Sequence, residues 1–218
     1  MLLKGIEQHS DQWIIARRGC VTTSRDADVV AKVSDPKKEA SARRNYRLEK
    51  LEEIFTERAT NHFVTDDMRW GMEMEGLART EYELRTGRTT VPGGFWQHDR
   101  IHKFRSSPDF LVGKDGMIEI KCPRTSTHLE YLAKREIPER YQWQILGELA
   151  CTGRKWCDFV SYDPRIKDEE LQFLSIRFER DDKLIRGLEL EVEYFLDEIT
   201  QIVELLRNGH KRQELMAG

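Results

Sequence analysis

The sequence predicts an α/β fold in which a central mixed sheet is flanked by helices. Short segments with period-two alternation are interleaved with longer segments of helical periodicity, a glycine-marked turn joins two of the short segments, and the C-terminal part carries a long apolar stripe. At 218 residues, with 39% apolar and 34% charged residues, the chain is expected to form one domain over 1–218 that ends in a helix.

Capping residues and apolar spacing predict the helices. The expected ranges are 10–18, 22–33, 36–58, 66–86, 138–151 and 181–207. Gly19 separates the first two, Gly87 ends the fourth and Gly153 follows the fifth, because glycine readily terminates a helix. The last helix is expected to bury a stripe made of Ile185, Leu188, Val192, Phe195, Ile199, Ile202 and Leu206.

Short runs bounded by turn residues predict the strands. The expected ranges are 95–99, 103–107, 109–112, 117–122, 156–162 and 171–179. A turn from Gly113 to Gly116 joins the third and fourth into a hairpin. These strands are expected to form the central sheet.

The hairpin segment "SPDFLVGKDGMIEIKCP", residues 107–123, contains charges where a buried strand normally has none. Alternation places Glu119 and Lys121 on one face, and Ile118, Ile120 and Cys122 on the face toward the core. Pairing of position 109 with 119 brings Asp109 beside Glu119, whereas pairing of 109 with 120 turns Asp109 to the opposite face. The sequence leaves both registers open.

Two interpretations of this cluster follow. Two carboxylates can bind Mg²⁺ through hard oxygen ligands while a nearby lysine orients or deprotonates a water molecule, or the three charges form a salt-bridge cluster at a sheet edge. Glu75 lies within a predicted inward helix stripe made of Met68, Gly71, Met72, Ala78 and Tyr82. It is either a further site carboxylate or the partner of Arg79 one turn later.

The segment "RYQWQILGEL" adds polar groups on one helix face. Tyr141, Gln144 and Glu148 share that face, and the amide of Gln144 is either a ligand for water or phosphate oxygen or ordinary helix polarity. Cysteines at 20, 122, 151 and 157 lack C-x-x-C spacing, so buried free thiols are expected, with an iron–sulfur cluster as the alternative.

Composition limits the class of protein. No apolar run approaches the ~20 residues of a membrane span, and the N-terminus has no apolar stretch typical of a signal peptide, so a cytoplasmic protein is expected. The net charge of −3 gives no global attraction to nucleic acid, although Lys and Arg are concentrated in residues 37–50. That segment is either a solvated helix face or a surface that contacts DNA.

The order of these motifs resembles a known family. A helix glutamate, then "SPD", "EIKCP" and "YQWQ", resembles the PD-(D/E)xK nuclease superfamily, and specifically the phage lambda exonuclease or YqaJ-type viral recombinase family. The segments "WIIARRGCVTTS", "WGMEME" and "SYDPRI" are similar to family segments in the same order, so the resemblance covers about residues 10 to 180. It implies a restriction-endonuclease-like fold.

The resemblance also implies roles for individual residues. The metal ligands would be Glu75, Asp109, Glu119 and the backbone carbonyl of Ile120, and the catalytic lysine would be Lys121. Gln144 would match the glutamine of a "QxxxY"-like segment, here without the tyrosine, and Arg17, Ser24 and Ser107 would hold the 5′-phosphate of the DNA. Phe110 departs from the family, which often has glycine after the aspartate.

The expected function is an Mg²⁺-dependent 5′-to-3′ exonuclease that uses two ions per site, with Mn²⁺ as a substitute, and leaves 3′ single strands on duplex DNA. The resemblance implies a single-strand annealing protein as partner and a homotrimeric ring that encloses DNA, with Arg43, Arg44 and Arg47 as contacts. The alternatives are an endonuclease of the same superfamily and an inactive DNA-binding module. A base role for Lys121 requires its pKa to be lowered.

Overall fold

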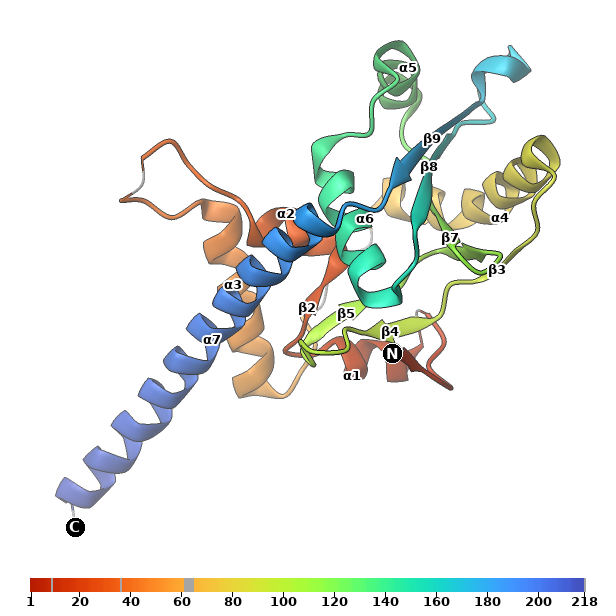
Figure 1. Ribbon diagram of the computed structural model, residues 1–218. Helices are drawn as coiled ribbons and strands as arrows, with labels where there is room; N and C mark the ends of the chain where they lie inside the picture. Colours follow the sequence, from red (N-terminus) through yellow and green to blue (C-terminus); the bar gives the residue numbers. More distant parts are fainter. Residues whose placement is uncertain (9, 36, 61–64, 218) are drawn as a thin grey trace.

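The helices and strands of the chain are arranged around two sheets (Figure 1). The computed structural model describes the backbone of residues 1–217, apart from 9, 36 and 61–64, and side chains as far as 209. None of the described helices has an apolar stretch long enough to cross a membrane. In chain order the elements are β1 (Leu2–Leu3), α1 (Asp11–Arg17), β2 (Val21–Thr22), the 3-10 helix η1 (Thr23–Arg25), α2 (Asp26–Val29), α3 (Ser41–Thr56), α4 (Asp66–Thr86), β3 (Thr90–Pro92), β4 (Phe95–Gln97), β5 (Phe104–Ser106), β6 (Phe110–Val112), β7 (Gly116–Lys121), α5 (Thr125–Lys134), α6 (Glu139–Thr152), β8 (Trp156–Tyr162), the 3-10 helix η2 (Glu169–Leu171), β9 (Phe173–Glu179) and α7 (Asp182–Ala217).

Both sheets are mixed. The larger has the strand order β3-β6-β7-β8-β9 and the smaller the order β1-β4-β5-β2. Strands β7 and β8 run parallel, as do β2 and β5, and the other neighbours are antiparallel. The predicted α/β class with mixed sheet and flanking helices is confirmed. The strands expected at 95–99 and 103–107, however, belong to the smaller sheet, because periodicity reports which face of a strand is apolar and not which strand lies beside it.

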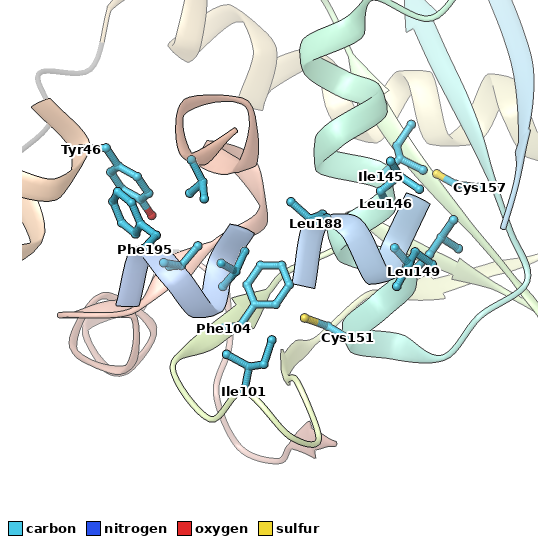
Figure 2. Packing of buried hydrophobic residues seen from close by; sticks show 14 of the residues in the cluster. Tyr46, Ile101, Phe104, Ile145, Leu146, Leu149, Cys151, Cys157, Leu188 and Phe195 are labelled. Atoms are coloured by element: carbon cyan, nitrogen blue, oxygen red, sulfur yellow. The ribbon is translucent and has the colours of Figure 1, made fainter. Parts of the chain in front are cut away.

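Helix α6 joins the two sheets into one core. It contacts β4 and β5 of the smaller sheet and β8 of the larger. Figure 2 shows Phe104 of β5, Leu149 of α6 and Leu188 of α7 in the resulting cluster, and all three are buried. The approach at Gly147 is so close that a Cβ atom there would lie 2.0 Å from Oδ2 of Asp26. The helix that carries Gln144 is therefore held tightly from several sides.

Helix α4 covers the opposite face of the larger sheet. The predicted alternation in β7 is confirmed, since Ile118, Ile120 and Cys122 pack in the cluster beneath α4. The helix contacts that cluster through a stripe at four-residue spacing, made of Trp70, Met74, Ala78 and Tyr82. The stripe predicted through Met68 and Met72 is wrong there, because these two side chains are 49% and 47% exposed.

Several element boundaries agree with the sequence. Helix α4 begins after Thr65, whose side chain accepts a hydrogen bond from the Met68 N–H, and ends at Gly87 in the left-handed conformation, as predicted. The predicted stripe of α7 is buried from Ile185 to Ile199. Beyond Ile199 the buried residue is Val203, whereas Leu206, which was predicted to belong to the stripe, is 52% exposed. Figure 1 shows the C-terminal part of α7 extending away from the sheets.

Other elements differ from the predictions. The helix expected at 22–33 is instead β2, η1 and the short α2, because Val21 and Thr22 pair in parallel with β5. The helix expected from residue 36 begins at Ser41. Helix α5 and strands β1 and β3 were not predicted, and the two strands have only two and three residues, too few for a periodic pattern. The four cysteines are buried free thiols, as predicted.

Gly93 controls how closely the chain before β4 approaches the chain before β6. Its N–H donates to the carbonyl oxygen of Asp109 at 3.0 Å, and a Cβ atom at Gly93 would lie 1.7 Å from the carbonyl oxygen of Pro108. Real Cβ atoms do not tolerate such a contact, so the backbone must move if a side chain is added. The position of Asp109 therefore depends on the absence of a side chain at residue 93.

We expect Gly93→Ala to lower the free energy of unfolding by about 1–3 kcal/mol, as other forced overpacking does, measured by urea denaturation. Gly76→Ala is the matched control, because Gly76 is exposed within α4 with open space around its Cα. That substitution should stabilise the protein by about 0.5–1 kcal/mol. Wild-type stability in Gly93→Ala would contradict the packing described here.

Candidate active site

The hairpin of β6 and β7 has the register that joins the two carboxylates. Phe110 lies opposite Ile118, so the continuation of the ladder places Asp109 opposite Glu119. Oδ2 of Asp109 accepts a hydrogen bond from the Ile120 N–H at 2.7 Å. Of the two registers that the sequence left open, the structure therefore has the one that brings Asp109 beside Glu119.

Glu119 is the centre of this group and is only 1% exposed. Its Oε1 accepts hydrogen bonds from Nζ of Lys121 and from Nε2 of Gln144, the latter at 2.6 Å. Its Oε2 is buried and has no hydrogen-bond partner in the described part of the chain. A buried carboxylate oxygen without a donor is costly, so this atom is suited to an external cation or donor.

The α6 residues approach from the other side of the site. Nε2 of Gln144 also donates to Oε1 of Glu148 at 2.9 Å, so both amide hydrogens are used. Glu148 is fully buried, and no described residue donates to its Oε2. The ring of Tyr141 lies 5.0 Å from Nζ of Lys121. The sequence placed these three residues on one helix face but assigned no function to Glu148; its four-residue spacing from Gln144 was the available signal.

Glu75 enters the same electrostatic environment from α4. Burial and the charge of Glu119 raise its pKa, and Lys121 opposes this. The alternative that Glu75 pairs with Arg79 is not seen, because the Arg79 guanidinium bonds instead to Thr90 and Glu83. Burial, followed by the Glu119 charge, raises the pKa of Asp109 well above its usual range. The three carboxylates thus repel one another in the protein as it stands.

Lys121 responds to this negative charge. Burial alone would lower its pKa, but Glu119 and Asp109 outweigh that effect and the net pKa is raised. The lowered pKa that a base role requires is therefore not seen while the charges of the neighbouring carboxylates remain uncompensated. Within the described residues, no three His, Cys, Asp or Glu side chains lie ready at the spacing of a metal site, and Glu119 is directed toward Lys121 and Gln144.

A second group of polar residues includes Ser107, which lies two residues before Asp109 in the chain. Nε1 of Trp13 donates to Oγ of Ser107 at 2.9 Å, and the Arg17 guanidinium stacks 3.9 Å from the centre of the Trp13 ring. Nη2 of Arg17 donates to Oγ1 of Thr22 at 3.4 Å, and Thr22 lies 3.5 Å from Oγ of Ser24. Arg17, Ser24 and Ser107, far apart in sequence, therefore converge. Thr22 and Trp13 connect them, and sequence reasoning gave neither residue a role in this site.

Two of the three arginines expected to contact DNA are engaged within the chain. Arg43 and Arg47 both bond to Glu198 of α7 and to Glu39. Their side chains are only 14% and 20% exposed. These guanidinium groups join α3 to α7, which is a structural function that the local sequence of residues 37–50 does not reveal.

Comparison with known proteins identifies the family. Residues 12–155 match the sequence profile described as the YqaJ-like viral recombinase domain. The chain belongs to this family. The match contains Arg17, Ser24, Glu75, the hairpin and the Gln144 helix, which are the residues of both groups described above. A search of curated protein sequences finds no match.

Solved structures agree with the family. The crystal structure of an alkaline exonuclease, LHK-Exo, from Laribacter hongkongensis is 40% identical with a TM-score of 0.87, over 94% of this chain and 100% of that one. The same enzyme in complex with dAMP is 39% identical with a TM-score of 0.86, over the same shares of the two chains. A phage-related exonuclease from Haemophilus somnus 129PT, 13% identical over 86% of this chain and 96% of that one, shares the fold with a TM-score of 0.68.

One departure from the family pattern is accommodated locally. Phe110, which stands where the family often has glycine, is half-buried, and the Arg79 guanidinium lies 4.8 Å from the centre of its ring. The ring packs beside the cluster beneath α4, on the face of the sheet opposite Glu119. The bulky side chain therefore points away from the carboxylates.

We expect a divalent cation to stabilise this chain by relieving the repulsion among the carboxylates. Mg²⁺ should raise the melting temperature of the wild type by a few degrees, since ~1 kcal/mol shifts a domain of this size by about 2–4 °C. Asp109→Asn should melt higher than the wild type without Mg²⁺ and gain less from it. Thermal unfolding with and without Mg²⁺ measures both.

Asp115→Asn serves as the control, because Asp115 lies in the hairpin turn with a side chain that is 51% exposed. It should keep the full Mg²⁺ effect. An equal rise in the wild type and in Asp109→Asn would show that cations bind somewhere else.

Proposed function

We propose that this chain is an Mg²⁺-dependent 5′-to-3′ exonuclease that digests one strand of duplex DNA from its end and leaves a 3′ single-stranded overhang. The observation that carries the proposal is the hairpin register, with Asp109 opposite Glu119 and with Glu119 bonded to Lys121 and Gln144. Support comes from the LHK-Exo relatives, one described as an alkaline exonuclease and the other as its complex with dAMP. A nucleoside monophosphate is the product expected of an exonuclease.

The residues present suit a hard divalent cation. The proposed ligands are the carboxylates of Glu75, Asp109 and Glu119 and the carbonyl oxygen of Ile120, and the unpaired Oε2 of Glu119 together with the raised pKa values of Glu75 and Asp109 indicates uncompensated negative charge. Two Mg²⁺ ions, or Mn²⁺ in their place, would supply activation of the attacking water and stabilisation of the leaving 3′ oxygen. The protein's part is to fix the ligand geometry.

Lys121 and Gln144 are proposed to complete the reaction site. As an ammonium, Lys121 can hold a phosphate oxygen or a water molecule by hydrogen bonds. Neutralisation of Glu119 and Asp109 leaves burial as the dominant influence on Lys121 and lowers its pKa, which allows it to accept a proton at alkaline pH. Gln144, held by Glu148, keeps its amide hydrogens on the carboxylates and leaves its carbonyl oxygen to accept from water.

The Arg17 group is proposed to bind the terminal 5′-phosphate. A guanidinium and hydroxyl groups are suitable donors for a phosphate. Ser107 and Asp109 are separated only by Pro108, so their backbones lie within about 7 Å of each other and a phosphate bound at Ser107 lies close to the proposed cleavage site. Each cut regenerates a 5′-phosphate at the new end, which gives the digestion a direction.

The cellular setting is also a proposal. Family resemblance supports a homotrimeric ring around the DNA and a single-strand annealing protein as partner. A cytoplasmic location suits a nuclease that acts in DNA recombination. Arg44 is the remaining candidate among the three arginines of α3, because Arg43 and Arg47 are already paired with acids of this chain.

The activity is tested with linear and circular duplex DNA in Mg²⁺. The wild type should degrade only linear duplex, with a rate that rises toward alkaline pH. Asp109→Ala, Glu119→Ala and Lys121→Ala should each lose cleavage by at least ~100-fold while remaining folded by circular dichroism, and Lys121→Arg should not restore it because a guanidinium does not deprotonate. Cleavage of circular duplex would indicate an endonuclease, and absence of cleavage with retained DNA binding would indicate an inactive module.

Arg17→Ala tests the phosphate site. Loss of charge-assisted hydrogen bonds should slow digestion of 5′-phosphorylated DNA by about tenfold or more, with little effect on 5′-hydroxyl DNA. The measurement is the ratio of the two rates, which cancels general effects on folding. An unchanged ratio would remove Arg17 from the phosphate site.

A further inference from the structure

We infer that Arg105 is a second anion-binding guanidinium beside Arg17, and that it contributes to selection of the DNA end. This inference rests on the proposed function, since it adds a residue to the proposed phosphate site. Neither the family motifs nor the sequence singled out Arg105, which lies in the middle of β5.

The sheet register places Arg105 among the residues of that site. Arg105 lies directly opposite Thr22 in the parallel β2–β5 pair, so their side chains project from the same face of the smaller sheet, with backbones about 4.8 Å apart. Thr22 is the residue that bonds to Arg17 and contacts Ser24. Alternation along the chain puts Ser107 on this face as well, while Phe104 and Ser106 are buried on the other.

Helix α1 approaches this same face of the sheet. It contributes Trp13, which bonds to Ser107, and Arg17, which bonds to Thr22. On the sheet, Arg105 is adjacent to Thr22 across the strands and two residues from Ser107 along the chain. The three polar positions therefore surround the base of the Arg105 side chain.

The guanidinium of Arg105 lacks a partner in the described structure. Its Nε and Nη1 atoms are both buried without an acceptor. Arginine keeps its charge at any ordinary pH, so two buried donors without an acceptor carry a substantial desolvation cost. Nearby cations such as Arg25 and Lys50 form ion pairs with carboxylates. Arg105 forms no ion pair with a described residue.

Arg17 is in a similar state. Burial lowers its pKa and outweighs the opposing electrostatic effects of Tyr46, Glu53 and Glu49. Its described direct contacts are a hydroxyl and an aromatic ring. Two guanidinium groups on one face, neither of them bonded directly to a described carboxylate, leave positive charge that a phosphate dianion would balance. A fork of donors from two arginines also distinguishes a terminal phosphate from the singly charged phosphates along the strand.

The test uses Arg105→Met, which preserves much of the side-chain volume and removes the charge, in thermal unfolding with inorganic phosphate as probe. Because the unpaired guanidinium is costly, Arg105→Met should melt at or above the wild type without phosphate, and should lose most of the phosphate-dependent rise. The ratio of digestion rates for 5′-phosphorylated and 5′-hydroxyl DNA should fall by about tenfold or more. Arg105→Lys keeps the charge without the fork and should fall between the two proteins in both measurements.

Arg186→Met is the matched control, since Arg186 is exposed on α7 and should change neither measurement. The inference is overturned if Arg105→Met keeps the wild-type phosphate effect and rate ratio, or if it melts well below the wild type, which would show a structural role. If Arg17→Ala alters the rate ratio and Arg105→Met does not, the proposed 5′-phosphate site stands without Arg105. If neither alters it, the proposed site itself fails.

Discussion

The burial of the Glu119 carboxylate is the constraint on which the rest of the site depends. A carboxylate that is 1% exposed must be compensated, and in this chain Lys121 from the same strand and Gln144 from α6 do so. These bonds define where α6 lies relative to β7, and Glu148 extends the chain of contacts into the helix. The compensation is incomplete, since one oxygen of Glu119 and one of Glu148 have no described donor. Incomplete compensation is what suits the site to an added cation.

Close backbone approaches maintain this geometry. Gly93 lets the chain before β4 pass against Pro108 and Asp109, and Gly147 lets α6 pass against Asp26. Gly116 at the start of β7 lies against Trp156, where a Cβ atom would be 2.0 Å from the ring. Each glycine brings one element of the site nearer than any side chain permits. The separation of the two polar groups, linked through Ser107-Pro108-Asp109, follows from these contacts.

Some of the unpaired polar groups lie where the proposed function needs an external partner. Oε2 of Glu119 has no described donor although Lys121 bonds to the other oxygen, and Nε and Nη1 of Arg105 have no described acceptor. Some buried charges elsewhere are matched, as at Asp158, which accepts bonds from Tyr82, Arg88 and Arg177, whereas neither carboxylate oxygen of the buried Asp26 has a described donor. The unpaired atoms of Glu119 and Arg105 lie at two adjacent places, the first suited to a metal ion and the second to a phosphate.

Local sequence was sufficient where one segment determines its own structure. Alternation in "MIEIKC" correctly placed Ile118 and Ile120 on the face toward the core and Glu119 on the other face, and sequence signals located both ends of α4. The order of the motifs also led to the family, because each motif is a short contiguous segment that can be recognised in the sequence without the structure. The buried stripe of α4 is rotated about the helix axis relative to the predicted stripe. The reason is that the face of β7 and β8, against which α4 packs, is not specified by the sequence of the helix itself.

Tertiary structure alone decided which distant segments meet. The register that places Asp109 opposite Glu119 depends on how the turn closes, and two registers were compatible with the same pattern. Arg43 and Arg47 bond to Glu198, which is more than 150 positions away in the sequence. The sequence of residues 37–50 alone therefore suggests an available basic surface, although two of its three guanidinium groups are already paired. Nothing in the local sequence distinguishes Arg105 from other strand residues. Only its position opposite Thr22 in the sheet places it beside the proposed phosphate site. The sequence by itself determined which residues are chemically able to act; long-range pairing determined which of them are free to do so.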